Sequence, residues 1–267
     1  MKAAPFAYAK PRALEEALDL AARPNAKVLA GGQSLIPSLN MRLSYPELLV
    51  DINGLDELKG IRLDKDIVRI GALATHAEIG KSDVVTKHLP LLSTAVPHIA
   101  HPAIRNRGTI GGSLALADPA AEYPACVLAL DATIIATGKK GERKIKAGDF
   151  FNGLFETALK PGEILTAVEF KAQKKDEKSA FLELARRQGD YATIGLAAFA
   201  TNGTKRLAYF GAADRPVLAQ NAAKAKDLES AKAALAKDLQ PSADLYHSTA
   251  TKLHLARVLL ERAWNTL

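Results

Sequence analysis

The sequence predicts an α+β protein made of three consecutive parts. Apolar residues recur at helical spacing in some segments and alternate with polar residues in others. Two glycine pairs, Gly31-Gly32 and Gly111-Gly112, mark loops between such segments. Residues 171–178 are charged and poor in core residues, which indicates a boundary. The predicted parts are residues 1–55, 56–172 and 173–267.

The first part is expected to read strand–helix–strand. Residues 13–22 carry leucine and alanine at helical spacing and are closed by Pro24-Asn25. Residues 27–30 form a short strand that leads into the first glycine pair, and residues 46–52 form another buried strand. A loop that follows a strand is well placed to present backbone N–H groups to a ligand.

The second part is expected to be mixed. Residues 60–63 and 67–71 alternate like antiparallel strands, and Thr75 begins a capped helix. An apolar segment at helical spacing ends at His101-Pro102. The other predicted elements are a helix over 125–130, a strand over 132–136, a hairpin turn at 138–141 and a strand over 164–170.

The third part is expected to combine an antiparallel sheet with helices. Residues 181–185, 193–201 and 206–211 predict three adjacent strands, and residues 219–239 and 243–264 predict two helices.

Composition limits the possible functions. The net charge is +7, and residues 171–267 hold sixteen Lys and Arg against ten Asp and Glu. This excess is either a solvated basic surface or a docking face for an acidic partner. Nucleic acid binding is disfavoured, because few aromatic residues lie among the lysines. We expect a cytoplasmic protein, since no apolar segment reaches the length of a signal peptide or membrane span.

The single cysteine, Cys126, excludes an internal disulfide, an iron–sulfur cluster and a cysteine-rich zinc site within this chain. It lies in an apolar segment, which favours a buried structural thiol.

Glycine pairs let backbone N–H groups approach a phosphate closely, because no Cβ interferes. Two such loops, about eighty residues apart, suggest a diphosphate held from two sides. Taken singly, each is more often an ordinary tight turn. Neither contains the Gly-x-Gly-x-x-Gly or Gly-x-x-x-x-Gly-Lys-Ser/Thr pattern, so a Rossmann or P-loop site is disfavoured.

Residues 30–35 (AGGQSL), 105–112 (RNRGTIGG) and 117–122 (ADPAAE) together resemble the FAD-binding medium subunit of the molybdenum hydroxylases, the xanthine dehydrogenase and carbon monoxide dehydrogenase family. The resemblance continues through residues 184–192 (LARRQGDYA). It implies a two-subdomain FAD-binding fold of the vanillyl-alcohol-oxidase/PCMH type, followed by a small C-terminal domain of antiparallel sheet and helices.

The resemblance also implies where FAD binds. Its contacts are expected in two loops: the first glycine loop (residues 29–36) and the second glycine loop (residues 108–113). Backbone N–H groups of both loops are expected to hold the diphosphate. The implied residues are Leu29, Ala30, Gly31, Gly32, Gln33, Ser34, Leu35, Ile36, Ile99, Ala100, Thr109, Ile110, Gly111, Gly112, Ser113, Glu122, Leu165 and Tyr191.

Several of these positions have alternative interpretations. Glu122, where relatives usually carry Asp, is either a ribose or adenine ligand or a surface acid that caps the next helix. Tyr191 lies either beside the isoalloxazine ring or in the core of a strand. A lysine that relatives often carry is replaced by the residues at 182–184, which leaves a lysine contact to the flavin without support.

The histidines and arginines near the second loop are also open. His98 and His101 are more simply structural than metal ligands, and we predict no metal site and no acid–base catalytic residue. Arg105 and Arg107 contact either phosphate or carboxylates that hold the loop.

The function implied is that of an FAD-binding electron-transfer subunit. Its expected partners are a molybdopterin-binding large subunit and a small subunit with two-iron two-sulfur clusters, assembled as a dimer of heterotrimers. The alternative is a stand-alone flavin reductase or oxidase of the same FAD-binding superfamily. Substrate and electron acceptor are not encoded here in recognisable form.

Overall fold

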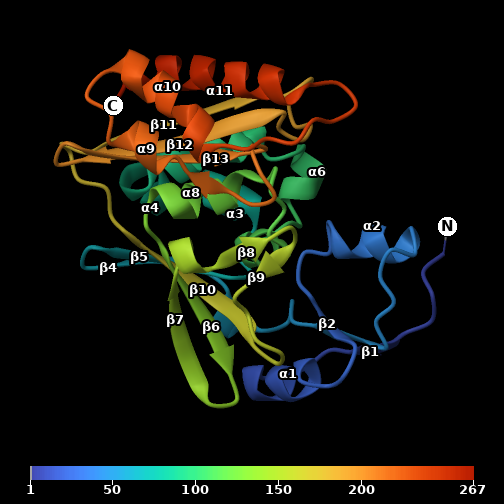
Figure 1. Cartoon of the computed structure of the whole chain (residues 1–267). Coiled ribbons are helices and arrows are strands. Elements are labelled where there is room, and N and C mark those ends of the chain that lie inside the picture. The colour runs from blue at the N-terminus through green and yellow to red at the C-terminus, as the bar shows by residue number, and fades with distance from the viewer. Residues whose placement is uncertain (1) are drawn as a thin grey trace.

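The computed structural model describes residues 2–267 and shows three larger sheets and one two-stranded sheet in an α+β arrangement (Figure 1). The C-terminal sheet and its helices lie at one end of the molecule, a five-stranded sheet lies in the middle, and a small N-terminal lobe that carries α2 stands to one side. The α+β class that the sequence predicts is confirmed.

The N-terminal lobe is a parallel three-stranded sheet in the order β1-β3-β2. Ala17 and Leu18 of the first helix and Val50 of the central strand form its core, because burial of an amphipathic helix face stabilises a small parallel sheet. The elements are β1 (Ala7–Ala9), α1 (Leu14–Ala21), β2 (Ala26–Leu29), α2 (Leu35–Asn40) and β3 (Leu48–Asp51).

The middle sheet is antiparallel, in the order β4-β5-β10-β6-β7. Its strands alternate between the two faces, so that Val68 and Ile70 are buried while Arg69 faces outward. The strands are β4 (Ile61–Asp64), β5 (Ile67–Gly71), β6 (Thr133–Gly138), β7 (Gly141–Lys146) and β10 (Ile164–Lys171), and a small hairpin is formed by β8 (Phe151–Gly153) and β9 (Glu156–Thr157).

Short helices cover the inner face of this sheet. Thr75 caps α3 in a reciprocal capping box with Glu78, as the sequence predicts. The helix predicted over residues 89–100 ends earlier, since α5 passes into a 3₁₀ turn that stops at His98. The helices are α3 (His76–Lys81), α4 (Asp83–His88), α5 (Pro90–Ala95), η2 (Val96–His98), α6 (Pro102–Arg105), α7 (Ile110–Leu116) and α8 (Glu122–Ala129). Two further 3₁₀ turns are η1 (Asp56–Leu58) and η3 (Ala147–Asp149).

The C-terminal sheet has the order β11-β12-β13-β14 and lies between two helical layers. One face packs on α5 and α8, and the other on α9 and α11. Its elements are β11 (Lys178–Leu184), β12 (Ile194–Thr201), β13 (Thr204–Phe210), β14 (Val217–Leu218), α9 (Gln220–Ala223), α10 (Leu228–Asp238) and α11 (Thr249–Trp264).

The two helices predicted in this part were wrong in their extent. The first is interrupted before Asp227, whose side chain accepts the Ser230 N–H and caps a new helix. The second begins only after Ser248, because Asp244 holds the preceding segment in a turn through the N–H groups of Tyr246 and His247.

One buried apolar cluster joins the middle and C-terminal parts. Phe181 and Phe210 of the C-terminal sheet pack together with ring centroids 5.6 Å apart, in the same core as Val127 of α8 and Val68 of β5. The thiol of Cys126 is fully buried in this core, as predicted. The division at residues 55 and 172 stays a prediction, since the core runs across the second boundary. Within residues 2–267, no helix is long and apolar enough to cross a membrane.

Candidate flavin-binding site

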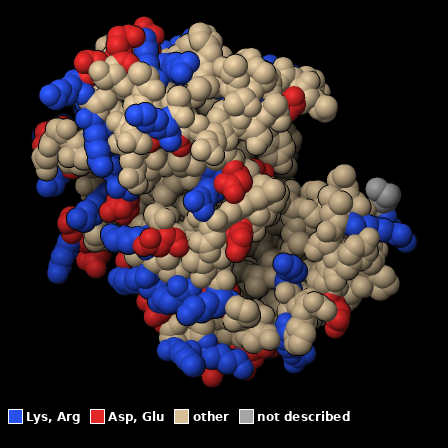
Figure 2. Space-filling model, viewed as in Figure 1, with Lys and Arg blue, Asp and Glu red and all other residues tan. Residues whose placement is uncertain are grey.

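The two glycine loops touch each other. A Cβ added to Gly31 would lie 2.1 Å from the Arg107 carbonyl oxygen and 2.9 Å from the Gly108 Cα. A Cβ added to Gly112 would lie 2.9 Å from the Thr109 hydroxyl oxygen and 3.9 Å from the Ala30 Cβ of the first loop. Only glycine permits such an approach between two backbones. The loops meet between the lobe that carries α2 and the rest of the molecule, where the surface in Figure 2 is hollowed.

The first glycine loop presents free donors. Within residues 2–267, the backbone N–H groups of Gly31, Gly32, Gln33 and Ser34 donate to no acceptor. The loop is nevertheless fixed: the Gln33 amide donates to the Gly31 carbonyl at 2.9 Å, and the Asn53 amide donates to the Ala30 carbonyl at 2.8 Å. Gly32 adopts a φ of +72°, which favours glycine. Successive free N–H groups on a fixed loop fit an anionic diphosphate.

The second glycine loop is the start of a helix. Thr109 is the N-cap of α7, and its hydroxyl accepts the Gly112 N–H at 3.1 Å. The Gly111 N–H donates to the Ala72 carbonyl, and the Ser113 N–H to the Thr109 carbonyl. The chain therefore already uses the N–H groups of Gly111, Gly112 and Ser113, whereas the Thr109 N–H donates to no acceptor within residues 2–267. The contact of this loop with the diphosphate stays a prediction. The hydroxyls of Thr109 and Ser113 keep the capacity to donate.

The turn at Ile99 and Ala100 is held from two sides. Arg105 Nη1 donates to both carbonyl oxygens, at 2.9 and 2.8 Å. A Cβ on Gly189 would lie 2.5 Å from the Ala100 oxygen, so that the loop before β12 packs directly on this turn. Arg105 thus holds backbone, which was neither of the two roles considered for it. Arg107 contributes its carbonyl to the contact with Gly31, and its side chain is exposed.

The remaining predicted residues lie in different surroundings. Tyr191 is in the loop between β11 and β12 and is 73% exposed, so the interpretation as a core strand aromatic is wrong. Glu122 is the first residue of α8 and is partly buried. Ala121 is the N-cap and the helix has no side-chain cap bond, so Glu122 does not cap it. Leu165 points into the core of the middle sheet. Their contacts to FAD stay predictions.

Burial and like charge perturb the acids near Tyr191. Burial raises the pKa of Glu122 to about 7, and Asp118 adds to the shift. The pKa of Asp118 is also raised by burial, although the Ala120 N–H donates to its carboxylate and opposes this. The pKa of Tyr191 is raised by partial desolvation of its ring, although the residue is largely exposed, and by the negative charges of Asp118, Glu122 and Asp190.

The sequence did not predict the burial of two polar side chains, His76 and Glu183. His76 is 5% exposed, and burial lowers its pKa to about 4. Its ring lies 5.2 Å from that of Tyr123, and its Nε2 would be 2.7 Å from a Cβ at Gly108. Glu183 has a side chain only 2% exposed. A buried acid in a strand that faces helices has no local sequence signature.

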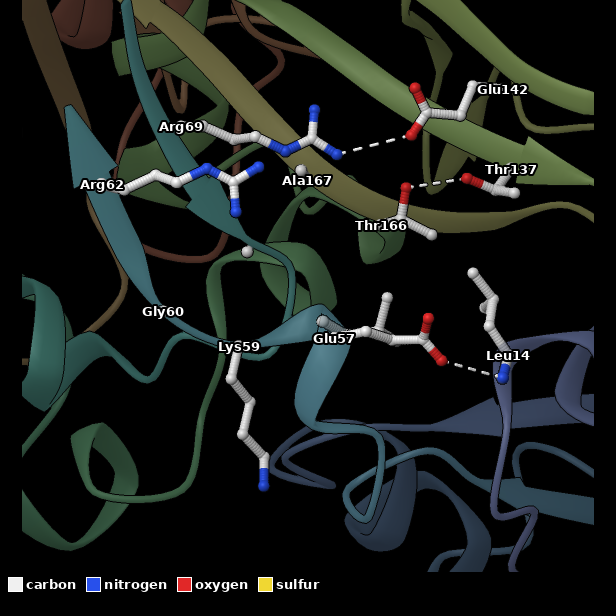
Figure 3. A pocket seen from close by; sticks show the side chains of 12 residues that line it. Leu14, Glu57, Lys59, Gly60, Arg62, Arg69, Thr137, Glu142, Thr166 and Ala167 are labelled. Atoms are coloured by element: carbon white, nitrogen blue, oxygen red, sulfur yellow. Dashed lines mark hydrogen bonds and ion pairs between the residues drawn. The ribbon is translucent and has the colours of Figure 1, made fainter. Parts of the chain in front are cut away.

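A separate cavity of about 150 Å³ lies on the outer face of the middle sheet. Figure 3 shows the guanidinium groups of Arg62 and Arg69 side by side at its edge, with Arg69 paired to Glu142. Neither glycine loop contributes a residue to it. Among residues 2–267, no three His, Cys, Asp or Glu side chains are grouped so that they could hold a metal ion.

Comparison with known proteins identifies the family. Residues 4–170 match the family described as "FAD binding domain in molybdopterin dehydrogenase". The chain is 38% identical over 278 residues to the alpha subunit of the 6-hydroxypseudooxynicotine dehydrogenase complex of Paenarthrobacter nicotinovorans, with 98% of this chain and 94% of the relative covered. It is 39% identical over 194 residues to the carbon monoxide dehydrogenase medium chain of Hydrogenophaga pseudoflava, with 72% and 68% covered.

Solved structures agree over the whole chain. The carbon monoxide dehydrogenase of Hydrogenophaga pseudoflava superposes with a TM-score of 0.95 at 34% identity, covering 100% of this chain and 98% of that one. Quinoline 2-oxidoreductase from Pseudomonas putida 86 superposes with a TM-score of 0.91 at 36% identity, covering 98% and 96%. The resemblance and the fold that the motifs indicate are both confirmed. The chain belongs to the family of FAD-binding subunits of the molybdenum hydroxylases, the xanthine and carbon monoxide dehydrogenase type, and is an oxidoreductase subunit whose cofactor is FAD.

Proposed function

We propose that this chain passes electrons from the iron–sulfur clusters of a partner subunit, through its FAD, to an external acceptor. The partners are a molybdopterin-binding large subunit and a small subunit with two-iron two-sulfur clusters, assembled in the cytoplasm as a dimer of heterotrimers. Relatives described as a medium chain or as a subunit of a complex support this assembly.

The observation that carries the proposal is the contact between the two glycine loops. Gly31 lies against the backbone of Arg107 and Gly108, and the neighbouring N–H groups have no acceptor in the described chain. A loop that is fixed by Gln33 and Asn53 while its donors stay free is preorganised for an anion. The diphosphate of FAD supplies that anion.

The residues divide the work of holding the cofactor. The N–H groups of residues 31–34 would bind the diphosphate, with the hydroxyls of Ser34, Thr109 and Ser113 beside them. The Ile99–Ala100 turn would contact the rings. Bound FAD supplies the redox chemistry, and the chain supplies orientation and hydrogen bonds. The cysteine content fits this division, because Cys126 is fully buried and the clusters must lie on another subunit.

The test is to express the chain alone and together with the chains encoded beside it, and to record visible spectra during reduction by substrate. We expect a yellow chain that co-purifies with two others, and bleaching of the flavin only when those chains are present. A colourless chain that takes up no FAD contradicts the proposal. A yellow chain that alone turns over NAD(P)H with a small substrate favours the stand-alone reductase or oxidase instead.

A further inference from the structure

Glu183 lies between the C-terminal sheet and the helices α5 and α8, which pack on one face of that sheet. Phe181 and Glu183 are two residues apart on β11 and therefore face the same side. Phe181 is buried in the core shared with α5 and α8, and its ring lies 5.1 Å from that of His98. His98, at the end of η2, therefore lies beside both side chains.

The carboxyl group of Glu183 has an oxygen without a partner. Its Oε2 is buried and makes no hydrogen bond within residues 2–267, and the side chain is 2% exposed. Nδ1 of His98 lies 3.6 Å from this oxygen. An ionised carboxylate buried in this way is strongly disfavoured, so the group is expected to carry a proton. His98 is 37% exposed and connects the acid to solvent.

The surroundings of Glu183 are negative or neutral. Helix α8 carries three titratable groups, Glu122, Tyr123 and Cys126. Besides burial, the charge of Glu122 raises the pKa of Glu183, and the charges of both glutamates raise the pKa of Cys126. Asp118, Asp190 and Tyr191 face Glu122 from the adjacent loops. The α5 segment contributes no titratable side chain. The guanidinium of Arg105 is bonded to the Ile99–Ala100 turn. No cation neutralises the two glutamates.

We propose that Glu183, with His98 as its contact to solvent and Glu122 as its charged neighbour, is a proton-holding residue beside the flavin, and that the fraction of Glu183 that is ionised at mildly alkaline pH takes up a proton when negative charge is added at the flavin. In this step a proton leaves a solvent acid and bonds to a carboxylate oxygen of Glu183, with His98 as the relay, and no bond of the chain breaks. The inference rests on the proposed function, because it places the flavin at the Ile99–Ala100 turn, which directly follows His98.

Electrostatics support this assignment. Burial, and then the charge of Glu122, raise the pKa of Glu183 to about 8. Burial lowers the pKa of His98. The two groups therefore face each other as a neutral acid and a neutral imidazole near pH 7, and not as an ion pair. A group whose pKa lies close to the working pH responds most strongly to an added charge.

The first test needs no flavin. Because the pKa of Glu183 is higher in the folded than in the unfolded chain, the folded state holds more protons between about pH 4.5 and pH 8, and stability falls as pH rises through that window. We expect Glu183→Gln to flatten the fall of the melting temperature of the full chain across this window. Glu15→Gln, which changes an exposed carboxylate of α1, is the matched control and is expected to leave the fall unchanged. An unchanged profile in Glu183→Gln overturns the assignment.

The second test measures protons directly. The FAD-loaded full chain is reduced at about pH 8 in weak buffer with a pH-indicating dye. We expect proton uptake per flavin to be lower in Glu183→Gln than in the wild type and in Glu15→Gln, and the midpoint potential of the flavin to depend less on pH. His98→Gln is a second variant and is expected to slow the uptake.

The outcomes separate the two proposals. Equal uptake in wild type and Glu183→Gln overturns the coupling to the flavin, even if the first test succeeds. Failure of the wild type to bind FAD removes the proposed function and the coupling with it, while the stability profile still decides whether Glu183 holds a proton.

Discussion

The two glycine loops look alike in sequence and differ in what their backbones do. The first precedes a short helix, α2, whose N-cap Ser34 makes no side-chain cap bond. The second starts α7, whose N-cap Thr109 accepts the Gly112 N–H. Within residues 2–267, the N–H groups of residues 31–34 stay free, whereas those of Gly111, Gly112 and Ser113 are bonded within the chain.

This difference shows that glycine is used for two purposes. In the first loop, Gly31 lets the backbone lie against its neighbour while donors remain available for a ligand. In the second, Gly111 lets α7 pack on Ala72, where a Cβ would lie 2.6 Å from the Ala72 Cβ and 2.7 Å from its oxygen. We propose that the first loop binds the diphosphate and that the second mainly supports the first. The following predictions test this division.

Gly31→Ala should have the largest effect, because its Cβ would lie 2.1 Å from a backbone oxygen that cannot rotate away. The loops must separate, so we expect flavin retention to be lost and the free energy of unfolding to fall by about 3 kcal/mol. Flavin absorbance after gel filtration and urea unfolding measure the two effects. Gly148→Ala is the matched control, since nothing lies within 4 Å of its Cβ, and it should change neither. Full flavin retention in Gly31→Ala contradicts the assigned contact.

Gly111→Ala should lower stability by about 2 kcal/mol, because the new methyl group meets Ala72 in a packed core. An unhindered alanine in a helix would instead stabilise it by about 1 kcal/mol, so even the sign of the change is informative. Urea unfolding gives the result. Increased stability would show that α7 can move away from the middle sheet, and that the second loop is not a rigid support.

The helix caps offer a paired comparison. Thr109→Ala removes the acceptor of the Gly112 N–H and should cost about 1 kcal/mol in unfolding free energy, while Thr109→Ser retains the hydroxyl. Ser34→Ala should leave stability unchanged, because its hydroxyl caps nothing, and should weaken FAD binding. Thermal melts and flavin titrations of the three variants decide. Equal destabilisation by Thr109→Ala and Ser34→Ala would mean that the two loops are capped alike.

Sequence alone predicted the fold class and many of the elements, while the FAD-contacting residues stay predictions. Alternation predicted β4 and β5, helical spacing predicted α1, and Thr75 predicted the capped start of α3. These signals are local, because each depends on residues within one turn or one hairpin. The motifs also indicated the two loops that the structure brings together.

The errors concern features set by tertiary contacts. The second glycine loop was expected to offer its N–H groups to a ligand, but the Gly111 N–H donates to the carbonyl of Ala72. Ala72 follows the end of β5, about forty positions earlier in the chain. Arg105 was expected to contact either phosphate or carboxylates, and instead it donates to two carbonyl oxygens of a turn. Glu183 was considered only as the absence of a lysine. Its burial depends on how the C-terminal sheet packs on α5 and α8, which no local pattern encodes.

The smallest expected effect is that of Gln33→Ala, and it isolates preorganisation from binding. The Gln33 amide donates to the Gly31 carbonyl and fixes the direction of the neighbouring N–H groups without using them. Its loss should weaken FAD affinity by about fivefold, the equivalent of one net hydrogen bond, with no change in unfolding of the flavin-free chain. Isothermal titration with FAD and urea unfolding measure the two quantities.

Gln33→Glu is the matched variant: it keeps the length of the side chain, removes the donor and adds a negative charge beside the free N–H groups. It should therefore bind FAD more weakly than Gln33→Ala, because the added charge repels the diphosphate. Equal affinity of the two variants would mean that the anion lies away from the first loop, and the division of labour between the loops would then be wrong.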